Sequence, residues 1–546
     1  MTWVSLNTLQ LGLMTLWAIF AFAFGASAGS LINVLVYRLP RGLDVVWTGS
    51  RCPACETKLT WRENIPVFGW LFLRGRCRFC RSKISAEYPL VEALVGLLWV
   101  AMYLVYYAIP EHTLLFGVDI SAIRPVWAAT DSFDGWPRTT WPIFIVHLFA
   151  IASLVAMTLV DAKTFTIPLV IPWAATIAAI LFHTIGAILI SANPHARIQW
   201  APGANWAIPT PGWPNHTDRL WWWIGASLGG MVGLAVGMAL LHFKLIRRSF
   251  EDYPEWERQA LKAQGIDPDN PASGSAPDEG VPVGEHVGPG VRLVLRFTIT
   301  WLAFFLAAGF LGQHLAPGLG YPDWAGAAVG LLSGPFVAAL ACRSLAPPTS
   351  PSDHAAPSPA PATSDTPPPS DQPSAPELWT AYPHARREML KELIFLTPAM
   401  GLAWLGGTLA THFAGVNPVA IPLWLSVLCG TLMGYLIGGA AVWGIRIAGS
   451  LGFGKEAMGL GDAHLMAAVG ACFGWVTAGL ASFPLGAVVG LFAVIVAVLA
   501  NRRAGRAMPF GPYLAIATLL IVFGRPLVEM GLTTLAAVPP PGIRLP

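Results

Sequence analysis

The sequence predicts an all-α, polytopic helical membrane protein that carries one small polar module. Its 546 residues are 55% apolar and only 12% charged. Apolar runs of about 20 residues, the length that crosses a bilayer as a helix, recur from one end of the chain to the other. A compact polar stretch interrupts them only at residues 38–88. The net charge of +3 says little about partners.

Windows of about 20 apolar residues predict about twelve spans. The first, Leu11 to Val36, is too long for the apolar region of a signal peptide and lacks a small-residue cleavage signal, so we expect it to be retained. The tenth is short enough to be a half-span. The predicted spans lie near residues 11–37, 89–109, 142–160, 168–191, 220–242, 293–313, 324–341, 392–412, 422–446, 463–477, 478–500 and 508–524.

Basic residues predict the orientation of these spans. The segment Arg38 to Lys83 carries ten Lys and Arg residues, so the positive-inside rule makes it cytoplasmic and the N-terminus external. Alternation from there places Asp161, Asp462 and the polar module on one face of the membrane. The predicted cytoplasmic loops after the module are 161–167, 243–292, 342–391, 447–462 and 501–507.

The polar module contains two C-x2-C pairs, Cys52 with Cys55 and Cys77 with Cys80, which are separated by 21 residues. Two such pairs suit tetrahedral Zn²⁺, because each supplies two thiolates from one tight turn. Two disulfides are the alternative, and a reducing cytoplasm disfavours them. Four thiolates leave no open coordination position, so we expect a structural metal in a zinc-ribbon-like module.

Two aspartates stand at predicted membrane edges. Asp462 follows two glycines, Gly459 and Gly461, and opens an apolar run, whereas Asp161 ends the run that begins at Ile143. A carboxylate at a membrane boundary is costly, so a functional role is the default interpretation. Two such acids suggest an aspartic peptidase dyad, in which one carboxylate activates water and the other protonates the carbonyl or the leaving group.

The segment from Glu456 to Trp475 resembles the GxGD region of type IV prepilin peptidases. Three other blocks resemble the same family in the same order, namely Gly29 to Pro40, Cys52 to Glu92 and Pro509 to Ile516. The chain departs from the family pattern at Leu169, where an acid is common, and at His464, where a lysine is usual.

The resemblance implies an intramembrane aspartic endopeptidase with Asp161 and Asp462 as its catalytic residues. Its substrates would be type IV prepilins or type II secretion pseudopilins, and its other partner membrane lipid, with no nucleic acid. It would be a multi-pass protein of the bacterial inner membrane, with the active site and the zinc module on the cytoplasmic side. Members that carry the cysteine block often also methylate the new N-terminus with S-adenosylmethionine. That activity rests on the resemblance alone, and its cofactor-binding residues are unknown.

The middle of the chain departs most from the family, because 301 positions separate the two aspartates where one helical hairpin is typical. The pattern W-x5-G-x3-G starts at Trp223, Trp324 and Trp424, which suggests a hairpin present three times. Residues 266–291 and 347–376 have the composition of disordered loops.

The expected organisation has five parts. They are a first span (1–37), the four-cysteine zinc-binding module (38–88), a membrane core with the first catalytic aspartate (89–191), inserted hairpins with disordered loops (192–421), and a membrane core with the GxGD motif (422–546).

Other interpretations stay open at this point. The chain could be a GxGD protease for other membrane substrates, a transporter that uses the two aspartates, or an inactive scaffold of the pilus export machinery. Glu388 and Glu392 have basic neighbours, and we expect them to be solvated. Glu456 could support the GxGD loop, and His464 could tune the dyad or simply pack.

Overall fold

The structure is a computed structural model in which most of the predicted membrane core is described. The described residues are 8–109 except 46, 48 and 53, then 114–115, 118–119, 140–192, 209, 220–263, 307, 382–415, 421–475 except 455 and 457, 482, 484–491 and 509–536.

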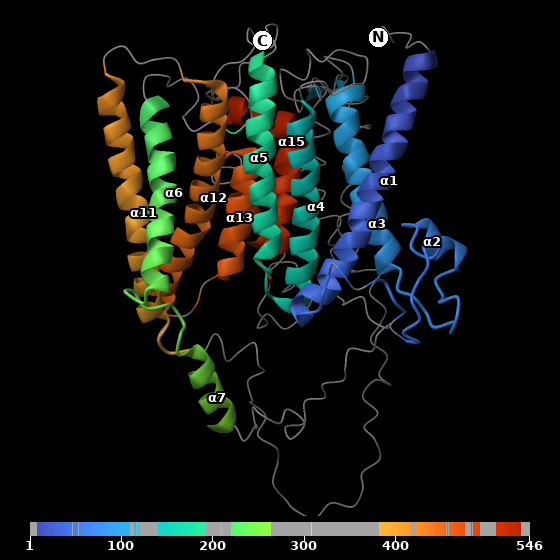
Figure 1. The fold of residues 1–546 in the computed structure, drawn as a ribbon, viewed down its shortest axis with the longest axis horizontal. Helices are drawn as coiled ribbons and strands as arrows, with labels where there is room; N and C mark the ends of the chain where they lie inside the picture. Colours follow the sequence, from blue (N-terminus) through green and yellow to red (C-terminus); the bar gives the residue numbers. More distant parts are fainter. Residues whose placement is uncertain are drawn as a thin grey trace, which may run out of the picture.

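Long apolar helices form a bundle (Figure 1). Among the described residues, seven helices are long and apolar enough to cross a membrane. They are α1 (Thr8–Arg38), α3 (Glu87–Tyr103) with the π-helical turn η2 (Leu104–Ala108), α4 (Trp141–Thr164), α5 (Val170–Ala192), α6 (Leu220–His242), α11 (Ala385–Ala414) and α12 (Leu423–Phe453). Two further apolar helices are α13 (Leu460–Phe473) and α15 (Gly511–Ala536). These helices confirm the predicted all-α polytopic class.

Small elements lie outside the long helices. The 3-10 turn η1 (Leu39–Arg41) and the short helix α2 (Phe68–Phe72) belong to the polar module, and α7 (Tyr253–Ala263) is a short helix that follows α6. The strands β1 (Leu114–Leu115) and β2 (Val118–Asp119) form a small antiparallel pair with Leu115 opposite Val118.

Nine of the predicted spans therefore correspond to described helices, and α13 has the short length expected of the tenth. The predicted spans 293–313 and 324–341, most of 478–500, and the predicted disordered loops 266–291 and 347–376 lie outside the described residues.

Glycines allow three helix pairs to pack closely. α1 packs along α3, where a Cβ on Gly29 would lie 2.6 Å from the Cα of Glu92. α12 packs along α13, where a Cβ on Gly434 would collide with the carbonyl oxygen of Gly470. α6 packs along α11, where a Cβ on Gly229 would collide with the backbone carbonyl oxygen of the facing residue. The α6–α11 pair occupies one edge of the bundle and the α1–α3 pair the other (Figure 1).

The proposed threefold hairpin stays a prediction, because its middle copy at Trp324 lies outside the described residues. The first and third copies place Gly229 and Gly434 at helix contacts, but with different partner helices, α11 and α13.

The main core lies where α4, α5, α12, α13 and α15 meet. Val146, Leu154 and Val160 of α4 pack there with residues of α13 and α15, including Leu465 and Leu514. This packing fixes the C-terminal end of α4 against the N-terminal ends of α13 and α15. Those helix ends carry the two predicted catalytic acids.

Candidate active site and cysteine cluster

Asp161 lies in the last turn of α4, where the chain turns into α5. Phe165 follows that helix in a left-handed conformation (φ 55°), and its N–H donates to the carbonyl oxygen of Asp161 at 2.9 Å. Pro168 accepts a bond from the N–H of Ile171 at 3.2 Å as α5 begins. The Asp161 side chain is only 5% exposed.

Asp462 lies in the first turn of α13. Gly459 precedes the helix in an extended conformation, and its carbonyl accepts a bond from the N–H of Asp462 at 3.3 Å. The Asp462 side chain is 6% exposed. The N-terminal end of a helix favours a negative charge, so this position suits an aspartate.

Three contacts bring the two helix ends together. The N–H of Gly511, at the start of α15, donates to Oδ2 of Asp161 at 3.1 Å, and a Cβ on Gly511 would lie 2.7 Å from that oxygen. A Cβ on Gly461 would lie 3.0 Å from the Cβ of Ile167 in the α4–α5 turn. Asp462 follows Gly461 directly, so the third contact is that of the first turn of α13 with the α4–α5 turn that follows Asp161. The structure therefore brings the two predicted acids together at one end of the bundle.

Neither aspartate forms an ion pair with another described residue. Two neighbouring carboxyl groups that are buried without an ion-pair partner resist full ionisation, so the pair tends to keep one proton, while the Arg446 guanidinium group acts on Asp462 only from beyond ion-pair distance. Such a pair can act as a base toward water through one carboxylate and as an acid through the other.

A buried arginine beside this site was missed by the sequence analysis. Arg446 of α12 is 2% exposed and forms an ion pair with Glu392 of α11 and another with Glu456, which lies in the loop before α13. Burial raises the pKa of Glu456 to about 6. The available signal was a lone arginine at the end of an apolar run, because a charge in such a place needs a partner.

The expectation that Glu388 and Glu392 are solvated was wrong. Their exposures are 0% and 3%. Glu388 pairs with Lys391 at 2.8 Å and with Arg387 at 2.8 Å, so its basic neighbours hold it in the interior rather than in water. His464 is only partly buried in α13, and its role stays undecided.

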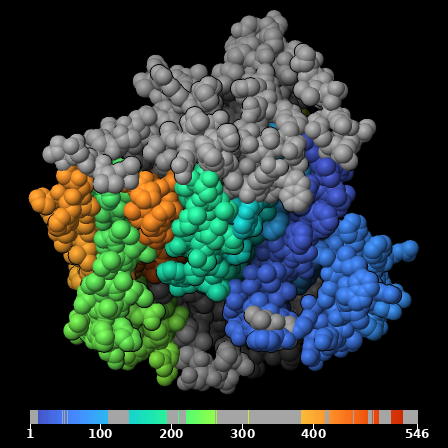
Figure 2. All heavy atoms as spheres, turned by 45° about the horizontal axis from the view of Figure 1, so that its top comes forward, coloured from blue at the N-terminus to red at the C-terminus, as the bar shows by residue number. Residues whose placement is uncertain are grey.

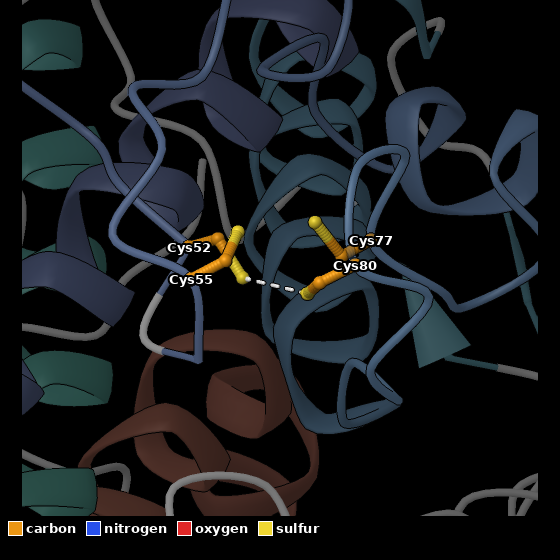
Figure 3. Close-up of side chains that lie close together, drawn as sticks. All are labelled: Cys52, Cys55, Cys77 and Cys80. Atoms are coloured by element: carbon orange, nitrogen blue, oxygen red, sulfur yellow. Dashed lines mark hydrogen bonds between the residues drawn. The ribbon is translucent and has the colours of Figure 1, made fainter.

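The four cysteines of the polar module form one cluster. Their sulfur atoms all lie within 4.8 Å of one another, and Sγ of Cys52 lies 3.8 Å from Sγ of Cys80 (Figure 3). A tetrahedral Zn²⁺ with bonds of about 2.3 Å separates its sulfurs by about 3.8 Å, so the cluster fits such an ion. None of the four is in a disulfide, which contradicts the alternative of two disulfides.

Each pair of cysteines lies in a turn with the same backbone pattern. The N–H of Glu56 donates to the carbonyl of Cys52, and the N–H of Arg81 donates to that of Cys77. Glu56 and Arg81 both have positive φ, 54° and 61°. A hydrogen bond with Ser82 lowers the pKa of the Cys80 thiol to about 6, which favours the thiolate that binds metals.

A contact from α3 fastens this module to the bundle, and it protrudes beside α1 (Figure 2). Glu92 of α3 accepts a bond from the N–H of Val67 in the module at 2.6 Å, and Asn33 of α1 donates to the carbonyl of Tyr88 in the first turn of α3 at 3.1 Å. Lys163, two residues after Asp161, pairs with Glu87 at 2.5 Å. This ion pair links the end of α4 to the start of α3, directly after the module.

Comparison with known proteins finds a similarity for this region first. Residues 23–106, which run from within α1 through the cysteine module and α3, match the bacterial peptidase A24 N-terminal domain. No solved structure matches the chain significantly.

Curated relatives carry a more specific name. The chain is similar to the prepilin leader peptidase/N-methyltransferase of Myxococcus xanthus, at 50% identity over 86 residues, which are 16% of this chain and 26% of the relative. It is similar to the protein of that name from Klebsiella pneumoniae, at 40% identity over 124 residues, 21% of this chain and 53% of the relative. For Aeromonas hydrophila, the identity is 39% over 115 residues, 17% of this chain and 40% of the relative. These matches span between a quarter and about half of each relative's length.

Proposed function

We propose that this chain is an intramembrane aspartic endopeptidase that removes the leader peptide from type IV prepilins or type II secretion pseudopilins. One observation carries the proposal. Two buried aspartates, 301 positions apart in sequence, lie at the neighbouring ends of α4 and α13 in a chain whose residues 23–106 are similar to the bacterial peptidase A24 N-terminal domain. The names of the relatives support the choice of substrate.

Asp161 and Asp462 act as the catalytic pair in this proposal. The ionised carboxylate takes a proton from a water molecule, and the water oxygen attacks the scissile carbonyl carbon. The protonated carboxyl group donates its proton to the carbonyl oxygen and so stabilises the tetrahedral intermediate. The N–H of Gly511 holds one oxygen of Asp161 and fixes the direction of the other. The apolar helix of the substrate docks from the lipid, which leaves the cleavage site at the membrane surface.

Cys52, Cys55, Cys77 and Cys80 would hold a structural Zn²⁺. When bound, the ion would crosslink the two turns of the module and stabilise its fold. All four ligands come from the protein, so the ion takes no part in peptide hydrolysis.

The protein belongs in the bacterial inner membrane, with the active site and the cysteine module facing the cytoplasm. The excess of basic residues in Arg38 to Lys83 supports this orientation. Methylation of the new N-terminus with S-adenosylmethionine is a second activity, suggested by the names of the relatives. The described residues present no set that we can assign to this cofactor, so we derive no methylation step.

Incubation of the detergent-solubilised full chain with a prepilin tests the function. We expect wild type to cleave after the glycine that ends the leader. Asp161→Asn and Asp462→Asn should each slow cleavage by about 10³-fold, because each removes a group that transfers a proton. Cleavage of other membrane-anchored substrates but not of prepilins would favour the broader GxGD protease, and absence of any cleavage would favour a transporter or a scaffold.

A further inference from the structure

Arg446 is a buried cation close to the loop that precedes α13, the helix that carries Asp462. It lies on α12, and the loop 454–459 joins that helix to α13. Its NH1 group donates both to the carboxylate of Glu456 and to the carbonyl oxygen of Met458. Two of the residues that immediately precede α13 are therefore tied to one guanidinium group.

The other side of the guanidinium group is held by α11. Nε and NH2 of Arg446 donate to the two carboxylate oxygens of Glu392 at 3.1 and 3.0 Å. Trp443 Nε1 donates to the same carboxylate at 2.7 Å and fixes its orientation. Such a bidentate pair gives directional bonds as well as charge compensation.

Helix α11 also holds the end of α12 where the loop begins. Nε of Arg386 donates to the carbonyl oxygen of Leu451 at 2.9 Å, and its NH2 donates to that of Gly452 at 3.4 Å. The helix then ends at Gly454, which has a left-handed backbone (φ 71°). One helix therefore fixes both the start of the loop, through Arg386, and its end, through Glu392 and Arg446.

We propose that Arg446 is a positioning residue for Asp462 and is itself held in place by Glu392. Helix α11 thereby sets the geometry of the loop 454–459, which leads into α13 and Asp462. This inference rests on the proposed peptidase function. Helix α11 lies within the region of the chain, 192–421, that departs from the family resemblance. The inserted region therefore has a role in catalysis although it supplies no group that touches the substrate.

The hydrogen bonds of Arg446 explain why loss of Glu392 should lower kcat. Removing the Glu392 charge leaves Arg446 with Glu456 as its remaining charged partner, so the guanidinium group shifts toward the loop. A shift of the loop displaces Asp462 relative to Asp161. Displacement of a catalytic group by about 1 Å can reduce a rate by about 100-fold.

The test compares Glu392→Gln with Glu388→Gln in the full chain, solubilised in detergent and supplied with a prepilin. Both glutamates are buried on α11 one turn apart, but Glu388 bonds neither Arg446 nor Gly454, Glu456, Met458 or Gly459, the residues of the loop 454–459 that the structure describes. We expect Glu392→Gln to lower kcat by about 10- to 100-fold, with KM changed less than about twofold. Glu388→Gln should keep kcat within about threefold of wild type. Equal kcat values in the two variants would overturn the proposal. An increase in KM with an unchanged kcat would also overturn it.

Hydrogen exchange of the intact protein supplies a readout that does not depend on activity. Arg446→Met should accelerate exchange at residues 454–461 while the cysteine module keeps its wild-type protection. Arg446→Lys should give intermediate exchange and an intermediate kcat, because lysine retains the charge but not the bidentate geometry. Unchanged exchange in Arg446→Met would contradict the positioning role.

These outcomes separate the inference from the function on which it rests. If wild type cleaves the prepilin and Asp462→Asn does not, the peptidase function stands, and the Glu392 and Arg446 variants then decide the positioning role. If wild type and Asp462→Asn behave alike, the function itself fails, and exchange at residues 454–461 still reports whether Arg446 holds the loop.

Discussion

Two groups of buried acids occupy the same end of this protein, and their partners differ. Glu388 and Glu392 of α11 are each paired with cations, Glu388 with Lys391 and Arg387 and Glu392 with Arg446. Asp161 and Asp462 are comparably buried but pair with no cation in the described part of the chain. Asp161 instead accepts one backbone N–H, from Gly511.

The difference separates acids that hold the structure from acids that are available for chemistry. A buried carboxylate with a bidentate cation stays ionised, and loss of either partner is destabilising. A buried pair of carboxyl groups without an ion-pair partner keeps a proton that it can transfer. Burial alone is therefore a poor guide to function at this membrane edge, and the charge partner is the better one.

The cysteine cluster is a third group of acidic side chains in this protein. Removing one of its thiols should have the largest effect of the changes considered, a loss of bound metal. Purified wild type should contain about one Zn²⁺ per chain, and Cys77→Ser should lose essentially all of it, since three thiolates hold the ion far more weakly than four. Elemental analysis measures the metal. Cys429→Ala is the control, because Cys429 lies in α12 outside the cluster, and it should keep the metal. Equal zinc in wild type and Cys77→Ser would show that the cluster does not hold this ion.

Gly511→Ala tests the backbone contact that distinguishes Asp161 from the paired glutamates. The added Cβ would lie 2.7 Å from Oδ2 of Asp161, so the carboxylate must move. We expect kcat for prepilin cleavage to fall by about 10- to 100-fold. Gly524→Ala on the same helix is the matched control, because its Cβ would meet nothing within 4 Å. Similar kcat values for the two variants would show that the Gly511 contact does not orient Asp161.

Much of this site was predictable from sequence because its chemistry is local. Asp462 follows two glycines at the start of an apolar run, Asp161 ends another, and the C-x2-C spacing identifies the four cysteines that the structure brings together. Nine predicted spans match helices in the described part of the chain, because a helix satisfies its own backbone hydrogen bonds within lipid. The structure adds the contact between Gly511 and Asp161, which joins parts of the chain 350 positions apart.

The interior charges could not be predicted in the same way. Glu392 and Arg446 are 54 positions apart, and the sequence around either residue does not predict that they pair. Glu388 with its basic neighbours has the composition of a solvated helix end. Whether such an acid is buried depends on which helix packs beside it, and α11 packs on α6 and α12.

Gly434→Ala tests whether close helix contact supports the loop between α12 and α13. A Cβ there would collide with the carbonyl oxygen of Gly470, so α13 would have to move away from α12. We expect a loss of about 1–3 kcal/mol in the free energy of unfolding, measured by denaturation in detergent. Gly444→Ala on the same helix is the control, since nothing lies within 4 Å of its added Cβ, and equal stability of the two variants would argue against this packing.

The smallest effect should come from the exposed ion pair of Asp252 and Arg387. A hydrogen bond from Tyr382 lowers the pKa of Asp252 to about 2, so its contribution to stability is present above about pH 4 and is lost as the pH falls through about 2. Both side chains are nearly half exposed, so solvent limits the contribution to about 0.5 kcal/mol. Asp252→Asn should therefore barely change the melting temperature at neutral pH. A large drop in the melting temperature would show that this exposed ion pair contributes as much to stability as the buried ones.

The central claim is that the two unpaired aspartates, rather than the paired glutamates beside them, perform the chemistry. Single-turnover cleavage of one prepilin by wild type, Asp161→Asn, Asp462→Asn and Glu388→Gln tests it most directly. We expect both aspartate variants to lose cleavage while the Glu388 variant cleaves at nearly the wild-type rate. Cleavage by either aspartate variant at the wild-type rate would contradict the claim.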